Sequence, residues 1–308
     1  MSYDIIGDVH GHADRLEALL QKLGYHHQSG TWRHPSRTAI FVGDLIDRGA
    51  HQVRTLRLVR SMTDAGTARV TMGNHEFNAI AWATPHPEVT GDHLRTRMGH
   101  KGRKNRSQHQ AFLADVGEDT AEHRSWIEWM QDLPVWIEEP DFRVVHACWS
   151  PKHAEALRPH LLEGYRLSAG LVDQASRKGS GMYQAIETLL KGEEVELPDG
   201  VSFFDKDGHE RHEVRTKWWD PSLSTYRRAC LGLNPNDVPD IPIVSREPIP
   251  EPDRPTFIGH YWLSSKSPMA PRSSRVACVD YSAGKGGPMV AYRFDGEVEL
   301  SADKFVAA

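Results

Sequence analysis

The chain has 308 residues, of which 39% are hydrophobic and 26% are charged, a balance that excludes a disordered chain and is typical of a soluble globular protein. Its 37 basic and 42 acidic residues give a net charge of −5, so the chain as a whole has no basic field that would recruit nucleic acid. No apolar run approaches the roughly 18 residues that span a bilayer, and three widely spaced cysteines predict neither a disulfide framework nor a zinc knuckle. A polar motif begins at Gly7 and leaves no room for a signal peptide, so we expect a cytoplasmic protein with no membrane partner.

The first part of the chain alternates strand-like and helix-like segments in the rhythm of an α/β sheet. Strands are expected at residues 3–7, 38–42 and 68–72, where apolar, β-branched and aromatic residues run together. Helices are expected at 12–23 and 53–62, where apolar residues recur at helical spacing. Because α/β sheets bind ligands at the carboxyl ends of their strands, polar side chains that follow these strands are expected to meet.

Each of these three strands is followed by a short motif of polar residues. The motifs are Gly-Asp-Val-His-Gly at 7–11, Gly-Asp-Leu-Ile-Asp-Arg-Gly at 43–49 and Gly-Asn-His-Glu at 73–76. A carboxylate of the central motif that met ligands from the other two could bridge two cations. Taken singly, an Asp-x-His is usually a turn and a Gly-Asn-His-Glu can cap a helix. Together at three strand ends, the motifs indicate a metal centre.

The region from 85 to 107 interrupts this rhythm with a run of basic residues. These residues are Arg95, Arg97, Lys101, Arg103, Lys104 and Arg106. The region is interpreted either as a solvated loop or as a mobile basic flap over an anionic substrate.

The rest of the chain is expected to form one domain with the first part, so that residues 1–308 are a single domain with a helical and hairpin insertion around 151–255. The helices expected in it are 107–115, 121–130 and 182–191. The strands expected in it are 135–137, 142–145, 256–260, 276–281 and 289–294. The turns and linkers expected in it are a turn at 205–208, a proline-rich and acidic segment at 234–255, and a glycine-rich hairpin turn at 284–287.

Two of these later strands end in histidine and complete a candidate set of metal ligands. The set is Asp8, His10, Asp44, Asn74, His146 and His260. Imidazole, carboxylate and amide ligands suit Zn²⁺, Fe²⁺ or Mn²⁺. If Asp44 bridges, one ion takes Asp8 and His10 with it, and the other takes Asn74, His146 and His260. Two ions about 3.5–4 Å apart can activate water at neutral pH and clamp a phosphoryl group.

The three motifs, in this order and at these separations, resemble the signature motifs of the calcineurin-like metallophosphoesterases. They are most similar to the PPP branch, which includes serine/threonine protein phosphatases and bacterial diadenosine tetraphosphate hydrolases. The motifs at 7–76 carry the resemblance, and Val145-His146-Ala147 and Gly259-His260 match the two later histidine motifs more loosely. The resemblance implies an α/β fold in which a β-sandwich is flanked by helices in four layers (αββα). It also implies two divalent metal ions, with manganese favoured over iron or zinc.

Further roles follow from the resemblance, residue by residue. Arg48 would bind the substrate phosphate, which a guanidinium matches bidentately. His75 would protonate the leaving group, oriented by Asp47, because a carboxylate fixes the tautomer of an imidazole and raises its pKa. Asn74 would contact the substrate as well as a metal. On the alternative interpretation, Asp47 and Arg48 simply pair with each other on the surface.

The sequence departs from the family around the later histidines, where the substrate pocket is expected. Trp149 and Trp262 lie two to three residues beyond His146 and His260, where they could stack on a base or pack in the core. No motif marks a second phosphate-binding residue. Arg215 and Lys217 are the candidates, with a half-exposed strand of paired charges as the alternative.

The sequence therefore predicts a metal-dependent phosphoric ester hydrolase whose partner is a phosphorylated substrate. The leading function is hydrolysis of phosphomonoesters, on proteins or small molecules, by direct attack of a metal-bound hydroxide. The alternative is hydrolysis of a dinucleoside polyphosphate such as diadenosine tetraphosphate. A non-catalytic binding protein would be expected to lack ligands, and none is missing. A nucleic-acid-processing role has only the basic segment at 95–106 in its support, and its binding would have to fall steeply with salt.

Overall fold

The computed structural model describes residues 2–204, 210–231, 238–244 and 247–308. The turn expected at 205–208 and parts of the segment 234–255 lie outside these residues. No helix in the described ranges combines the length and the apolar character needed to cross a bilayer.

The helices and strands of the described residues extend over the whole chain, and they alternate through its first half. The helices are α1 (Ala13–Leu23), α2 (Gln52–Asp64), α3 (Asn74–Ala83), α4 (Gly99–Val116), α5 (Ala121–Gln131), α6 (Pro151–Leu157), α7 (Ala169–Ser176), α8 (Gly181–Lys191) and α9 (Tyr226–Ala229), with short 3₁₀ turns η1 (Arg158–His160), η3 (Ala283–Lys285) and η4 (Ala302–Lys304). The strands are β1 (Ser2–Ile6), β2 (His26–Gln28), β3 (Thr31–Arg33), β4 (Arg37–Phe41), β5 (Ala68–Val70), β6 (Trp136–Glu138), β7 (Arg143–Val145), β8 (Glu194–Glu196), β9 (Phe203–Phe204), β10 (Glu210–Arg211), β11 (Glu213–Arg215), β12 (Thr256–Ile258), β13 (Val276–Cys278), β14 (Val290–Phe294) and β15 (Phe305–Ala307).

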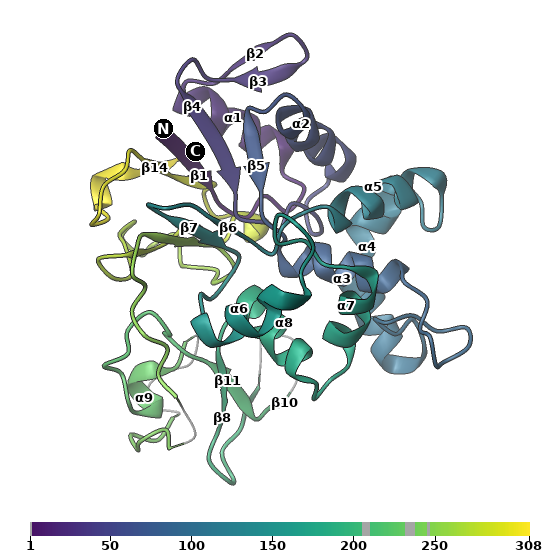
Figure 1. The fold of residues 1–308 in the computed structure, drawn as a ribbon, viewed down its shortest axis with the longest axis vertical. Helices are drawn as coiled ribbons and strands as arrows, with labels where there is room; N and C mark the ends of the chain where they lie inside the picture. Colours follow the sequence, from purple (N-terminus) through teal and green to yellow (C-terminus); the bar gives the residue numbers. More distant parts are fainter. Residues whose placement is uncertain (1, 205–209, 232–237, 245–246) are drawn as a thin grey trace.

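Two larger sheets are present in the described part of the chain (Figure 1). One has five strands in the order β15-β14-β1-β4-β5, in which β1, β4 and β5 are parallel and β14 and β15 run antiparallel to their neighbours. The other has four strands in the order β13-β12-β7-β6, with β7, β12 and β13 parallel. In the five-stranded sheet Ile5 lies between Ile40 and Tyr292.

The two sheets pack face to face because the apolar side chains of their strands alternate between two cores. Ile5 of the first sheet and Val144 of the second belong to one buried cluster between the sheets, whereas Ile6 and Val145 belong to the cluster on the outer faces. The aromatic members of the inner cluster are Tyr3, Phe142, Phe257, Tyr292 and Phe294. The fold is therefore the predicted β-sandwich flanked by helices.

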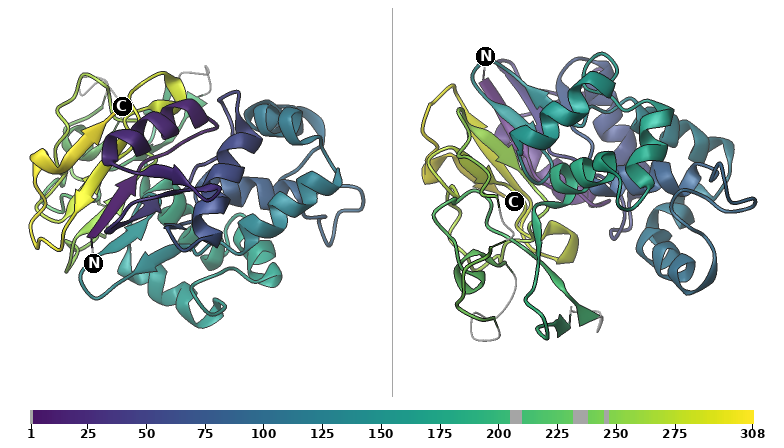
Figure 2. Two further views of the ribbon diagram at one scale, coloured as in Figure 1. Left: turned by 90° about the horizontal axis from the view of Figure 1, so that it is seen from above. Right: turned by 60° about the horizontal axis from the view of Figure 1, so that its bottom comes forward.

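Helices cover both outer faces of the sandwich. The buried leucines of α1 recur at helical spacing (Leu16, Leu19, Leu20 and Leu23), and the helix ends at Gly24, whose φ of 92° suits glycine. On the other sheet, the carbonyl of Leu189 in α8 accepts hydrogen bonds from the backbone after β7. In both views of Figure 2, α3, α4 and α5 lie at the side of the molecule opposite the C-terminal strands.

Two helices depart from the sequence-based expectation. Residues 73–76 are not only a loop, because α3 begins at Asn74, and nearly all faces of this helix are buried, which removes the amphipathic pattern. The basic segment at 95–106 is a loop only as far as residue 98, because α4 begins at Gly99 and contains its remaining residues. The first three buried positions of α4 are polar or small, so no hydrophobic periodicity marks the start of the helix. These positions are Gly102, Asn105 and His109.

The glycine-rich segment 284–287 is not a hairpin turn, so that expectation is wrong. The strand before it, β13, belongs to the four-stranded sheet, and the strand after it, β14, belongs to the five-stranded sheet. The chain crosses from one sheet to the other through η3. Turn residues report the local backbone shape and carry no information about which sheet the next strand joins.

The segment from β8 to α9 lies at the lower end of the molecule in Figure 1. Its strands pair in two short antiparallel ladders, β8 with β11 and β9 with β10. A small apolar cluster, separate from the two main cores, holds it together. The buried members of this cluster are Val195, Val214, Tyr226, Ala229, Cys230, Val238 and Ile243.

A buried carboxylate joins three neighbouring strands of the five-stranded sheet. Asp4 of β1 is fully buried and accepts hydrogen bonds from Arg37 Nε of β4 at 2.9 Å and from Arg293 Nε of β14 at 3.1 Å. We predict that Asp4→Asn lowers the free energy of unfolding by about 3 kcal/mol, because it leaves two cations without their shared anion. Urea denaturation measures this loss.

The matched control is Asp14→Asn on the exposed face of α1, where Asp14 pairs with Arg54 at the surface. This change should alter the free energy of unfolding by no more than about 1 kcal/mol. Equal losses in the two variants would contradict a structural role for Asp4.

Candidate metal centre

Loops from both sheets meet at one edge of the sandwich, and the predicted ligands lie on them. They follow β1, β4, β5, β7 and β12. Each of the six predicted metal ligands is at most 8% exposed. These are Asp8, His10, Asp44, Asn74, His146 and His260.

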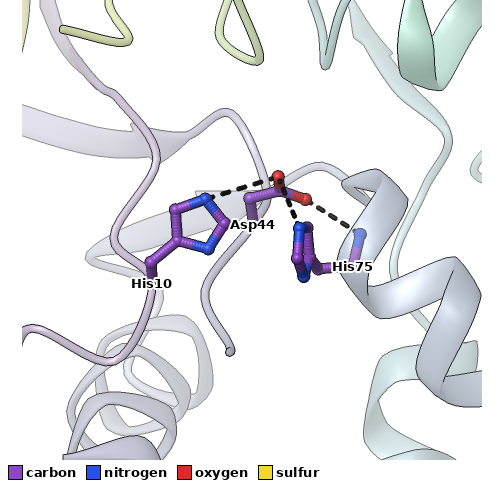
Figure 3. Close-up of side chains that lie close together, drawn as sticks. All are labelled: His10, Asp44 and His75. Carbon is purple, nitrogen blue, oxygen red and sulfur yellow. Dashed lines mark hydrogen bonds and ion pairs between the residues drawn. The ribbon is translucent and has the colours of Figure 1, made fainter. Parts of the chain in front are cut away.

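The carboxylate of Asp44 belongs to two groups of metal-ligating atoms among the described residues. The first group is His10, Asp44 and His75, and the second is Asp44, His146 and His260, with the atoms of each group within 4.8 Å of one another. Figure 3 shows the first group, in which Asp44 Oδ2 lies 3.7 Å from His10 Nε2 and 3.9 Å from His75 Nε2. In the second group Asp44 Oδ2 lies 3.3 Å from His146 Nε2.

Backbone carbonyls fix the tautomers of two of these histidines. His10 Nδ1 donates to the carbonyl of Ile46 at 2.8 Å, and His146 Nδ1 donates to that of Val42 at 2.7 Å. Because carbonyl oxygens only accept, the Nε2 atoms are left as ligand atoms directed into the centre. His146 Nε2 also lies 3.2 Å from Asn74 Oδ1, which brings the amide oxygen of Asn74 into the second group.

Several buried atoms of the centre fit a divalent cation. His10 Nε2 and both ring nitrogens of His260 are buried without a hydrogen-bond partner in the described part of the chain. Burial, followed by the charge of His75, lowers the pKa of His10 to about 3. Burial and then the charge of Arg215 lower the pKa of His260 well below its usual value. Both imidazoles are therefore neutral, the form that binds metal.

The pKa values of the carboxylates also indicate a bound cation. Burial raises the pKa of Asp8 well above its ordinary value, and the charges of Asp280 and Asp44 raise it further. Burial would also raise the pKa of Asp44, but His146 and His75 hold that pKa well below its usual range. A cation would relieve the repulsion among these buried anions.

Asp8 lies beside the first group rather than in it. Its carboxylate oxygens accept from the backbone N–H of His260 at 3.3 and 3.1 Å. Gly259 is required here, since a side-chain carbon on it would overlap Asp8 Oδ1. The first group contains His75 instead, and the role of Asp8 as a ligand of this ion stays a prediction.

Two buried carboxylates to which the sequence-based prediction gave no role hold the loops in place. Glu76 accepts from the backbone N–H groups of Asp44 and Leu45, both at 2.8 Å, and from that of Gly73 at 2.9 Å. Asp280 accepts from the N–H groups of Trp262 at 2.7 Å and Ser282 at 2.9 Å. Glu76 is at the third position of α3, where a helix-capping glutamate is a recognisable sequence signal.

The backbone of these loops is strained. Of the ten non-glycine residues with positive φ in the described ranges, six are in the loops of the centre. They are His10, Asp44, Asp47, Arg48, His260 and Trp262. Such conformations cost of order 1–3 kcal/mol each and cluster at functional sites.

Asp47 and His75 form a close pair beside the centre. His75 Nδ1 lies 2.5 Å from Asp47 Oδ2. Burial lowers the pKa of His75, but the charges of Asp44 and Asp47 outweigh it and raise that pKa. The other oxygen of Asp47 accepts from a histidine that the sequence did not single out, His109 of α4, at 2.8 Å. The signal that could have found it is weak, because one histidine in a basic run is usually a surface residue.

Arg48 is exposed, and it does not take the carboxylate of Asp47, whose oxygens accept from two histidines. Its guanidinium carbon lies 4.4 Å from the centroid of the Trp262 ring, and Lys285 Nζ lies 4.3 Å from the same ring. Trp262 is half-buried and its ring lies 5.5 Å from that of His10. Trp149 is instead buried in the core.

Of the two candidates for a second phosphate-binding residue, the structure brings one close to the centre. Arg215 is half-buried on β11 and lies near enough to lower the pKa of His260. Its Nε also lies 3.5 Å from Glu194. Lys217 Nζ donates to the carbonyl of Arg228 in an exposed position instead.

The comparisons with known proteins agree with this site. A family model described as Calcineurin-like phosphoesterase matches residues 1–167, more than half of the chain. The protein therefore belongs to the calcineurin-like phosphoesterase family.

Its relatives include two kinds of bis(5'-nucleosyl)-tetraphosphatase. An asymmetrical one of Halalkalibacterium halodurans is 50% identical over 76 residues, which cover 24% of this chain and 31% of the relative. A symmetrical one of Vibrio cholerae is 31% identical over 153 residues, which cover 49% of this chain and 46% of the relative. The matched regions thus span less than half of either relative's length. A protein serine/threonine phosphatase from Saccharomyces cerevisiae shares the fold, with a TM-score of 0.51 and 11% identity over 100% of this chain and 79% of that one.

We predict that Asp44→Asn lowers the bound metal to below one ion per chain and removes nearly all activity. A neutral amide is a poor bridge between two dications. Elemental analysis of protein reconstituted with Mn²⁺, together with an assay on 4-nitrophenyl phosphate, measures both effects. The control is Asp132→Asn, an exposed surface carboxylate paired with Arg166, which should retain both metal and activity. Normal metal content with normal turnover in Asp44→Asn would rule out the bridging role.

Proposed function

We propose that the protein is a dinuclear-metal phosphoesterase, and the observation that carries this proposal is the sharing of Asp44 by two ligand groups. Asp8 and His10 would hold one ion with Asp44, and Asn74, His146 and His260 would hold the other with Asp44. The mixture of nitrogen and oxygen ligands without thiolate suits Mn²⁺ first, with Fe²⁺ or Zn²⁺ as alternatives. When bound, two such ions activate water at neutral pH and neutralise charge on a phosphoryl group.

The protein's own residues would then orient the substrate and supply a proton. Arg48 is exposed beside the centre, where its guanidinium can bind two phosphate oxygens. Arg215 would be a second cation on the other side, near His260. Both side chains would position the phosphoryl group without taking part in bond breaking.

His75 would donate a proton to the leaving group. Its Nδ1 is held by Asp47, which leaves Nε2 as the atom that faces the substrate. The charges of Asp44 and Asp47 raise its pKa, the direction that suits a general acid. The side chain of His75 is 12% exposed and that of His146 is fully buried, so of these two histidines only His75 can exchange a proton with a substrate.

The leading substrate class is a phosphomonoester of a protein or small molecule. A single phosphate needs only the metal centre and Arg48, and both lie together at the same edge of the sandwich. The fold shared with the yeast serine/threonine phosphatase is compatible with this class.

The second candidate is a dinucleoside polyphosphate. The names of the two tetraphosphatase relatives favour it, and so does the pair of cations around Trp262. Arg48 and Lys285 each lie within 4.4 Å of the centroid of that ring, so they could bind successive phosphates, and a base could stack on the indole once one of these cations moves off the ring.

A substrate panel with defined metals separates the candidates. Metal-free protein is supplied with Mn²⁺, Fe²⁺ or Zn²⁺ and assayed on a phosphomonoester, a phosphodiester and diadenosine tetraphosphate, with Asp44→Asn as the blank. We expect metal-dependent hydrolysis of the monoester with the highest kcat/KM. A higher kcat/KM for diadenosine tetraphosphate would establish the second candidate. No metal-dependent hydrolysis of any of the three would overturn the proposal.

We predict that His75→Asn lowers kcat for phenyl phosphate by roughly 10²–10⁴-fold, the usual contribution of a positioned general acid. The loss should be much smaller for 4-nitrophenyl phosphate, because nitrophenolate leaves with little need of a proton. Bound metal should remain unchanged. An equal loss for both esters would show that His75 is not the acid.

A further inference from the structure

Helix α4 brings a buried histidine against the proposed acid pair. His109 is 4% exposed, and its Nδ1 lies 2.8 Å from Asp47 Oδ1, while Asp47 Oδ2 accepts from His75. The backbone N–H of Asp47 donates to Gln52 Oε1 at 2.7 Å. The carboxylate is thus held at both oxygens, by two different imidazoles from two different helices.

The bond to Asp47 is the polar contact that accounts for a histidine at this position. A carboxylate oxygen only accepts, so His109 Nδ1 carries the hydrogen and donates it. His109 Nε2 is buried and has no hydrogen-bond partner among the described residues. The ring packs on Phe112 at 5.0 Å and on Trp82 at 6.3 Å. An apolar side chain would satisfy this packing and would avoid the cost of an unpaired buried nitrogen.

Two other contacts of α4 hold the helix in the position that places His109 against Asp47. Asn105 Nδ2 donates to the carbonyl of Thr96 at 3.0 Å, one turn before His109. Gln108 Oε1 accepts from Arg95 at 2.7 Å, at the neighbouring position. The helix that carries the basic run is therefore anchored next to His109 by the buried amide of Asn105 and by the exposed amide of Gln108.

Asp47 is held at its side chain by the two imidazoles of His75 and His109. Its φ of 70° puts it in a strained loop conformation. Without His109 the Oδ1 atom loses its donor, and the carboxylate is free to turn about its Cβ–Cγ bond. A turned carboxylate would no longer hold the ring of His75 in one orientation, and small misplacements of a catalytic group cost up to about 10²-fold in rate.

We propose that His109 is a positioning residue, whose Nδ1–H fixes the Asp47 carboxylate so that Asp47 holds His75 for proton donation to the leaving group. This inference rests on the proposed function. It also gives α4 a role as the element that completes the acid, in place of a flap over the substrate.

The test compares two substitutions at one position. His109→Leu keeps the volume and removes the donor, whereas the amide nitrogen of His109→Asn stands near the place of Nδ1 and can donate to Asp47. Both are assayed with Mn²⁺ on phenyl phosphate and 4-nitrophenyl phosphate, with bound metal and Tm measured in parallel. The matched control is Phe112→Leu, which disturbs the packing on His109 and leaves the hydrogen bond.

We expect His109→Leu to lower kcat for phenyl phosphate by about tenfold or more and kcat for 4-nitrophenyl phosphate by less than about threefold. KM and bound metal should not change, and His109→Asn should recover most of the loss. Phe112→Leu should lower Tm and affect both esters alike.

Two results would overturn the inference. One is an equal loss for both esters in His109→Leu, which would mark a packing role. The other is a His109→Asn variant no better than His109→Leu, which would show that the hydrogen bond does not matter. Failure of the proposed function is seen separately, because it would appear as absent metal-dependent activity in the unchanged protein.

Discussion

The placement of Asp44 is the constraint on which the rest of the centre depends. Its carbonyl accepts from the N–H groups of Val9 and His10, at 3.0 and 2.9 Å, and so fixes the first loop. Its own N–H donates to Glu76, and its Oδ1 accepts from the N–H of His75 at 2.9 Å, which fixes the third loop. One residue thus joins the ends of β1, β4 and β5 and presents its second oxygen to both ligand groups.

The same placement brings buried carboxylates close together, and a bound cation would relieve the repulsion between them. Five buried carboxylates lie in or beside the centre, and they are Asp8, Asp44, Asp47, Glu76 and Asp280. The hydrogen bonds found for three of them, Asp8, Glu76 and Asp280, all come from backbone N–H groups, which holds the loops together at the expense of buried negative charge. The neutral imidazoles at His10 and His260 add ligands without offsetting that charge. The site therefore combines an excess of anions with unpaired nitrogens, the combination that divalent metals stabilise.

Much of this arrangement could be predicted from the sequence, because strands of a sheet expose their carboxyl ends at one edge. The strands before Asp8, Asp44 and His260 were identifiable from apolar runs, and the ligands followed from them. His109 could not be predicted, since it is far from the motifs in sequence and the buried positions that precede it in α4 are Gly102 and Asn105 rather than apolar residues. The passage of the chain from one sheet to the other at 284–287 could not be predicted either, because local turn residues do not specify the partner of the next strand. The approach of Arg215 depends on how β11 packs, which no local pattern encodes.

The most direct test of the account is to locate the metals themselves. Crystals soaked in Mn²⁺ would be measured at the manganese absorption edge, and an anomalous difference map would give the ion positions without assumptions about activity. The account predicts two peaks roughly 3.5–4 Å apart, both in contact with the carboxylate of Asp44. A single peak, or a second peak that does not contact Asp44, would contradict the bridged dinuclear centre.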